Sequence, residues 1–170
     1  MKSLKIFSYF FLIACLSVTC TQKHNYIIQQ NKDIENMQWK YTDKIAFDFA
    51  IEDTTKNYLL GICMRYTNNF PDANLYLFVR TTFPNQKQSC DTVSIDLFYP
   101  DGSPTGKGKR IKELNIVAAN LVFPQQGNYT ISLQQGNRYD TLPGVISAGI
   151  FISEETKNNN HETNIKKEQK

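Results

Sequence analysis

The sequence predicts an all-β protein: a single antiparallel β-sandwich, jelly-roll-like, of about seven or eight strands, with an N-terminal signal peptide and a disordered C-terminal tail. Three observations predict this fold class. Apolar and polar residues alternate with period two along the middle of the chain, and helical periodicity hardly appears. Clusters of Pro, Gly, Asn and Asp, which favour turns, separate the alternating segments.

The chain begins with the pattern of a bacterial secretory signal. Lys2 and Lys5 precede an apolar run that is too short to span a bilayer. Two cysteines are lipidation candidates: a small-residue lipobox precedes Cys15, while Cys20 ends the apolar run. We expect a diacyl group on Cys20 or Cys15, which would hold the protein at a membrane without a transmembrane helix. The alternative is an ordinary cleaved signal with incidental thiols.

The composition then divides the chain into four parts. A signal peptide over residues 1–19, or 1–14 if Cys15 is acylated, is followed by a tether over residues 20–38. The sandwich domain follows over residues 39–153. Residues 154–170 contain a single aliphatic side chain, so this tail cannot bury enough apolar surface to offset its ordering entropy.

The alternation of apolar and polar residues locates the predicted strands within the domain. In most of them every second residue is apolar, as with Phe47 and Phe49 in the first, and residues 111–123 are a weaker candidate. Gly149 in the last strand is expected to mark a close approach of another backbone, and Asp140 to Gly144 before it are expected to form a turn. The predicted strands lie within residues 44–51, 58–66, 74–82, 91–99, 111–123, 128–134 and 144–152.

The residue inventory argues against an enzyme. The two histidines, His24 and His161, fall outside the predicted domain, which argues against a histidine triad or a histidine zinc site within it. Asp48, Asp96 and Glu113 lie on or beside strands and are candidates for paired-carboxylate hydrolysis, but outward, solvated positions are the expectation. We therefore expect no catalytic residues, no metal site and no cofactor.

The charge excludes nucleic acid as a partner. The whole chain has 19 Lys and Arg against 16 Asp and Glu, and two of the lysines leave with the signal peptide. The formal net charge of +3 therefore falls to about +1 in the mature protein, which is too small for a nucleic-acid-binding surface.

Aromatic residues and cysteines supply two further candidates. Tyr76, Phe78 and Phe98 fall opposite the aliphatic rows of their strands and form a candidate aromatic binding face for a glycan or a protein. The alternative is that loops cover these rings. Cys63 and Cys90 form a candidate disulfide in an oxidising compartment, with two separate thiols as the alternative.

From Trp39 to Ile152 the chain resembles the gliding motility lipoprotein family GldH of the Bacteroidetes. The resemblance rests on Trp39 and on the segments IAFDFAIEDT, NLYLFVRTTFP, DTVSIDLFYPDGSPTGKG, FPQQGNYTISLQQ and RYDTLPGVISAGIFI. Two places depart from the family pattern: Ser103-Pro104 stand where an aromatic residue is usual, and Gly136-Asn137 stand before the arginine in place of Ala-Met or similar residues.

The resemblance implies a lipid-anchored protein of the cell envelope, and we expect it at the outer membrane, on the periplasmic side. Its implied partners are envelope proteins of the gliding machinery, which overlaps the type IX secretion system. The resemblance does not imply an enzyme. Arg138 and Asp140, in the segment that best matches the family, are candidates for bracing a turn or for docking a partner. A glycan-binding module that uses the aromatic face is the alternative function.

Overall fold

A computed structural model describes residues 26–155, so the candidate lipidation sites Cys15 and Cys20 and most of the predicted tail lie outside the described residues. The described chain is built almost entirely of strands, which confirms the predicted fold class. The elements are β1 (Tyr26–Asp33), the 3-10 helix η1 (Glu35–Met37), β2 (Gln38–Lys40), β3 (Ile45–Ile51), β4 (Tyr58–Tyr66), β5 (Asn74–Thr82), β6 (Gln88–Asp96), β7 (Lys112–Leu121), β8 (Gly127–Gln135), β9 (Thr141–Pro143) and β10 (Val145–Glu154).

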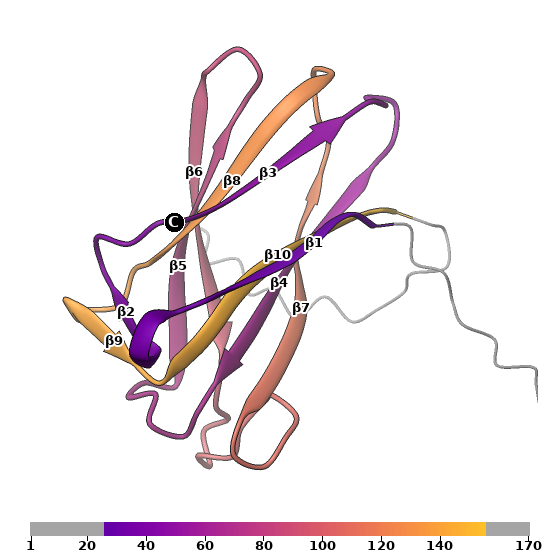
Figure 1. Cartoon of the computed structure of the whole chain (residues 1–170). Coiled ribbons are helices and arrows are strands. Elements are labelled where there is room, and N and C mark those ends of the chain that lie inside the picture. Colours follow the sequence, from indigo (N-terminus) through magenta and orange to yellow (C-terminus); the bar gives the residue numbers. More distant parts are fainter. Residues whose placement is uncertain (1–25, 156–170) are drawn as a thin grey trace, which may run out of the picture.

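Two four-stranded antiparallel sheets make the sandwich. One sheet has the order β1-β10-β4-β7 and the other has the order β3-β8-β5-β6 (Figure 1). Of the connections between these strands only the β5–β6 hairpin stays within one sheet, while the others cross between sheets. This interleaved order is that of a jelly roll.

The structure corrects the expected tether. From Tyr26 on, the segment assigned to it is part of the sandwich, because β1 pairs antiparallel with β10 along its whole length. The sequence of β1 hides this role because Ile28 is its only buried residue. An edge strand with one buried position has no alternating apolar pattern to detect.

A short ribbon, β2 paired with β9, closes one end of the sandwich. Trp39 lies opposite Leu142 in this ribbon; both side chains are buried, and the Trp39 Nε1–H donates to the Asp43 carbonyl at 3.0 Å. Residues 141–143, expected to belong to a turn, are therefore a strand, and Gly144, with a φ of 85°, joins this strand to β10.

The core lies between the two sheets and follows the predicted alternation. Phe47, Phe49 and Ile51 of β3 face the fully buried row of β4, and β5, β8 and β10 contribute similar rows. Gly149 marks a close approach, as expected: a Cβ there would clash with the Asn31 side chain and the Gln30 carbonyl of β1. The largest fully buried side chains are Trp39, Tyr58, Tyr66, Tyr129, Phe47, Ile62 and Met64.

The register defines two ends of the molecule. At the terminal end, β1 begins beside the last residues of β10, and the loops 52–57, 83–87 and 122–126 join strands. At the crossover end, four connections pass between the sheets, over residues 34–44, 67–73, 97–111 and 136–144. Within residues 26–155, no helix has the length and apolar character needed to cross a membrane.

Candidate binding surfaces

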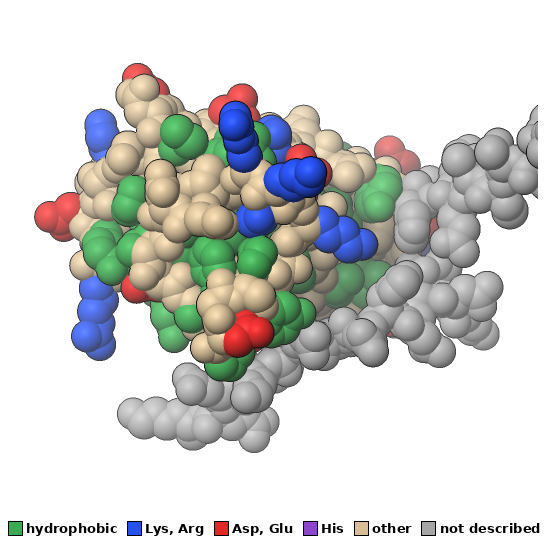
Figure 2. Space-filling model, turned by 90° about the horizontal axis from the view of Figure 1, so that it is seen from below, with side chains coloured by type: hydrophobic (Ala, Val, Ile, Leu, Met, Phe, Trp, Pro, Cys, Tyr) green, Lys and Arg blue, Asp and Glu red, His purple; other side chains and the backbone are tan. Residues whose placement is uncertain are grey.

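The crossover end carries most of the exposed apolar side chains. Seen from below, this end has Lys and Arg side chains mostly along one side and hydrophobic side chains across its middle (Figure 2). Single exposed apolar side chains are common, whereas exposed apolar side chains that gather on one end of a small domain are typical of a contact surface. Those at this end are Met37, Tyr41, Tyr99, Ile111 and Tyr139.

Four of the exposed side chains at this end belong to one small surface. We call it the ribbon tip, and it consists of Tyr41, Arg138, Tyr139 and Asp140, where β2 ends and β9 begins. The Tyr41 N–H donates to the Asp140 carbonyl at 2.8 Å, which fixes the two backbones together. The Gln134 side-chain amide donates to the Tyr41 carbonyl at 2.7 Å. The tip therefore presents its side chains from a held backbone.

The turn that carries the ribbon tip is braced by Asn137 and Gln135, and sequence reasoning missed both. Asn137 is 7% exposed and its Nδ2 donates to Asp72 Oδ2 at 2.7 Å and to the Asn74 carbonyl at 2.9 Å. The Nε2 of the fully buried Gln135 donates to the Tyr139 carbonyl at 2.7 Å. The only available signal was the departure of Gly136-Asn137 from the family pattern.

Arg138 and Asp140 therefore do not brace the turn with their side chains. Both are exposed, and no ion pair or side-chain hydrogen bond within residues 26–155 involves them. Burial and the neighbouring Asp72 raise the pKa of Tyr139, whose hydroxyl donates to Asp72 Oδ1 at 3.2 Å. Charged side chains without internal partners are free to contact another molecule.

The structure separates the three residues of the expected aromatic face. Tyr76 is 44% exposed on the outer face of β5, and the half-buried Phe78 lies on the same face with its ring against Gly136. Phe98 instead packs edge-on against the buried Tyr66, with ring centroids 5.6 Å apart. Alternation fails there because β6 ends at Asp96 and the N–H groups of residues 97 and 98 both donate to the Ala73 carbonyl.

Cys63 and Cys90 do not form the candidate disulfide. Cys63 lies in β4 and Cys90 in β6, which belong to opposite sheets, and both thiols are free. Burial raises the pKa of Cys63 to about 11, whereas Cys90 is exposed on an edge strand. A buried thiol with so high a pKa is unreactive.

The candidate carboxylates are spread over the molecule. Asp48 and Asp96 lie on the two opposite edge strands of one sheet, and Glu113 lies on β7 of the other sheet, paired with Arg65 at 3.2 Å. Each has a local structural partner: the Thr130 hydroxyl donates to Asp48 at 2.6 Å, and the Asn74 amide donates to Asp96. Within residues 26–155, no cluster of His, Cys, Asp and Glu is suited to hold a metal ion.

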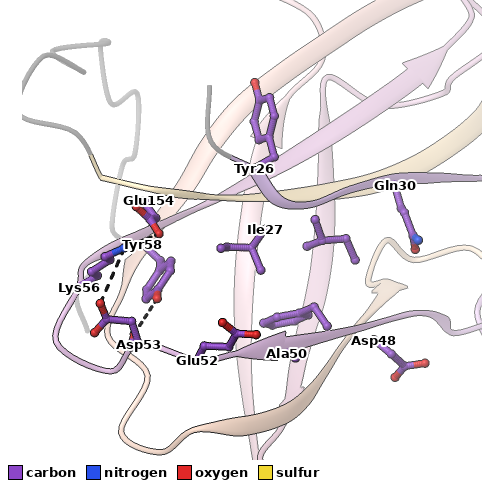
Figure 3. Close-up of a pocket in the computed structure, with 12 residues that line it drawn as sticks. Tyr26, Ile27, Gln30, Asp48, Ala50, Glu52, Asp53, Lys56, Tyr58 and Glu154 are labelled. Atoms are coloured by element: carbon purple, nitrogen blue, oxygen red, sulfur yellow. Dashed lines mark hydrogen bonds and ion pairs between the residues drawn. The ribbon is translucent and has the colours of Figure 1, made fainter. Parts of the chain in front are cut away.

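A groove opens where the two sheets part near the terminal end. Its volume is about 560 Å³, and it runs between the edge strands β1 and β3 (Figure 3). Ile27 points from β1 into this space, and the side chain of Glu52 reaches toward it from the end of β3. Ile28 and Phe49, each 8% exposed, add apolar surface to its lining.

An ion-pair network closes one end of the groove. Lys56 Nζ lies 2.7 Å from Glu154 Oε1 and 3.7 Å from Asp53 Oδ2, and the hydrogen bond to Glu154 raises the pKa of Lys56. Asp48 and Glu52 also line the groove, and neither joins an ion pair within the described residues. The lining thus holds four carboxylates against one lysine.

Comparison with known proteins shows the family to which this chain is related. The sequence model of the family described as GldH lipoprotein matches residues 26–152, which is nearly the whole of the described sandwich from the start of β1. The chain belongs to the GldH lipoprotein family. This confirms the resemblance noted in the sequence and extends it to include β1.

Two relatives with assigned names support the membership. The chain is 29% identical over 151 residues to the gliding motility lipoprotein GldH of Flavobacterium johnsoniae, covering 84% of this chain and 92% of the relative. It is 30% identical over 160 residues to a protein named gliding motility lipoprotein GldH homolog from Christiangramia forsetii, covering 89% of this chain and 96% of the relative. Each of these two relatives thus aligns with this chain over more than nine-tenths of its own length.

Proposed function

We propose that this GldH-family protein is a non-enzymatic lipoprotein of the outer membrane that faces the periplasm and docks onto the machinery for gliding motility or the associated type IX secretion. Family membership and the names of the two relatives support the lipoprotein and motility parts of this proposal. The spread of Asp48, Asp96 and Glu113 over three strands supports a binding role over catalysis. The ribbon tip is the proposed docking surface.

The position of the proposed anchor fixes which end faces a partner. If Cys20 carries the lipid, six residues lead to Tyr26 at the start of β1, and they span at most roughly 20 Å. The terminal end is then held near the membrane, and the crossover end points away from it. Acylation of Cys15 lengthens the connection but leaves the same end nearest to the lipid.

The observation that carries the docking proposal is the composition and rigidity of the ribbon tip. Tyr41 is 47% exposed and Tyr139 is 38% exposed, and the free charges of Arg138 and Asp140 stand beside them. Tyrosine and arginine are the residue types that most often dominate protein interfaces. A tip whose backbone is already fixed loses little conformational entropy on binding.

The test compares matched triple variants in cells. Tyr41→Ala with Arg138→Ala and Asp140→Ala removes three of the four side chains of the tip. The control, Val122→Ala with Lys87→Ala and Asp91→Ala, removes an exposed apolar, basic and acidic residue away from the crossover end. We expect the tip variant to lose surface spreading, secretion of type IX cargo and co-purification of envelope proteins, while the control retains them. A gene deletion that leaves spreading and secretion normal would contradict the motility role. A tip variant that behaves like the wild type would contradict the docking site.

Glycan binding is the second candidate, and it now rests on Tyr76 and Phe78, which share the outer face of β5. A single well-exposed ring offers one stacking position for a sugar. A glycan array probed with the wild type and with a Tyr76→Ala, Phe78→Ala variant separates this function from docking. The glycan hypothesis requires a sugar signal that the double variant loses.

A further inference from the structure

The edge of β3 has backbone groups that no strand covers. β3 is the terminal strand of its sheet and pairs only with β8. Lys32 of β1 donates to the Ala46 carbonyl at 2.6 Å, so this carbonyl points away from β8 and toward the open side. Because edge groups alternate along an antiparallel strand, the N–H and C=O groups of Asp48 and Ala50 point to the same open side.

Lys32 closes only part of this edge. Its Nζ occupies the edge at Ala46 and lies 5.4 Å from the centre of the Phe47 ring. A lysine placed on an edge in this way discourages strand pairing. The neighbouring stretch from Asp48 to Ala50 has no such cover and lines the groove instead (Figure 3).

We propose that the groove accepts an extended segment of another protein, which adds as a fifth strand beside β3 and carries alternating apolar and basic side chains. This goes beyond the docking proposed at the ribbon tip, because it uses the other end of the molecule. Strand addition to an open sheet edge is an established mode of peptide recognition, in which main-chain hydrogen bonds supply affinity and side-chain pockets supply specificity.

The lining of the groove sets the chemistry of the segment. On the side that faces the core, an added strand lies between Phe49 of β3 and the isoleucines Ile27 and Ile28 of β1. This lining favours apolar side chains. On the outer side it runs beside Asp48, and it meets Glu52 at the end of β3. Since these two carboxylates have no ion-pair partner within the described residues, lysine or arginine fits there.

The position of the groove is consistent with a partner near the same membrane. It opens close to Tyr26, where β1 begins, and so on the proposed anchored end. Ala46 and Ala50 flank Asp48 on the outer face of β3, and these small side chains leave room for a neighbouring strand to approach. The added strand extends the sheet without displacing any existing pair.

The test uses the full-length protein in detergent and a synthetic ten-residue peptide that alternates lysine with valine. We expect binding to slow amide hydrogen exchange at Asp48 and Ala50 by at least about tenfold. A peptide that alternates glutamate with valine should bind at least about tenfold more weakly, because the groove is acidic. Equal binding of the two peptides, or no protection of these amides at about 1 mM of the lysine peptide, would overturn the proposal.

Two variants test binding at this edge, and one of them, Ala50→Pro, distinguishes strand addition from simple charge attraction. Ala50→Pro removes an edge N–H that β8 does not use, so it should leave the fold intact and weaken binding at least about tenfold. Asp48→Lys should weaken binding as well, whereas the matched Asp91→Lys on the exposed edge strand β6 should not. If Ala50→Pro fails to fold, Asp48→Lys, which leaves every backbone group in place, still tests the location of the site, and the protection of the Asp48 and Ala50 amides still tests strand addition.

Other occupants of the groove are separate outcomes. Protection of the Asp48 and Ala50 amides in the protein alone, lost on dilution, would assign the groove to a second copy of the chain. Protection that disappears when residues 156–170 are deleted would assign it to the chain's own C-terminal segment. Either result would overturn the proposal of a different partner, and neither would affect the ribbon tip.

Discussion

The side-chain amide of Asn137 is tied to the backbone of Tyr76: its Oδ1 accepts the Tyr76 N–H at 2.9 Å. The same amide donates from Nδ2 to the Asn74 carbonyl and to Asp72. One buried side chain thus joins the turn after β8 to β5 and to the loop before it. This joint holds the ribbon tip in position.

Asn137→Ala should therefore destabilise the protein by about 2–3 kcal/mol, because it removes three hydrogen bonds and leaves a buried N–H and C=O without partners. The neighbouring Arg138→Ala should stay within about 0.5 kcal/mol of the wild type, since that side chain is exposed. Urea unfolding followed by circular dichroism measures both free energies of unfolding. Equal stability of the two variants would contradict the role given to Asn137.

Gly144 and Gly102 form a matched pair of glycines with almost the same backbone angle, φ of 85° and 81°. A Cβ on Gly144 would lie 2.5 Å from the Phe70 nitrogen, whereas a Cβ on Gly102 would meet nothing within 4 Å. Gly102→Ala should cost about 1 kcal/mol for the left-handed conformation alone. Gly144→Ala should cost about 2 kcal/mol more, because backbone atoms cannot move aside. Thermal unfolding of the two variants measures the difference, and equal costs would contradict the close approach.

The two cysteines of the sandwich should differ in reactivity. In the native protein at about pH 8, N-ethylmaleimide should modify the exposed Cys90 and leave Cys63 unmodified, because burial raises the pKa of Cys63 to about 11. In urea both thiols should react. Mass spectrometry of tryptic peptides identifies the labelled cysteine. Detection of a disulfide between the Cys63 and Cys90 peptides would contradict the assignment of two free thiols.

Asp53 makes stability depend on pH in the acid range. The Thr55 hydroxyl and N–H donate to its carboxylate at 2.6 Å and 2.9 Å and hold the pKa of Asp53 below its ordinary value of 3.8. A depressed folded-state pKa means that this contribution is present above about pH 4 and disappears as the pH falls through the folded pKa. Asp53→Ala should reduce the loss of stability below about pH 4.

Asp101 offers a second test of the same effect, because Ser103 donates to it in the same way and lowers its pKa. The free energy of unfolding of the double variant Asp53→Ala, Asp101→Ala should fall less on acidification than that of either single variant. Urea unfolding at a series of pH values from about 6 to about 2 measures this fall. Identical pH profiles for the wild type and the double variant would contradict the assignment.

The sequence determined the strands that have one buried face. Alternation with period two is a local property of an extended backbone, so the buried rows of β3, β5 and β8 could be predicted from residues two apart. Gly149 could be predicted in the same way, because a glycine inside a strand indicates crowding by another backbone. These features require no knowledge of which strands are neighbours.

Only the tertiary structure decided the rest. β1 became a strand by pairing with β10, which is more than a hundred residues away, and its own residues show no alternation. Phe98 turned toward Tyr66 because β6 ends before it, and Asn137 gained its role from Tyr76, far from it in the chain. The groove exists because the edges of two sheets part there. Each of these depends on contacts between distant segments, which the pattern of neighbouring residues does not encode.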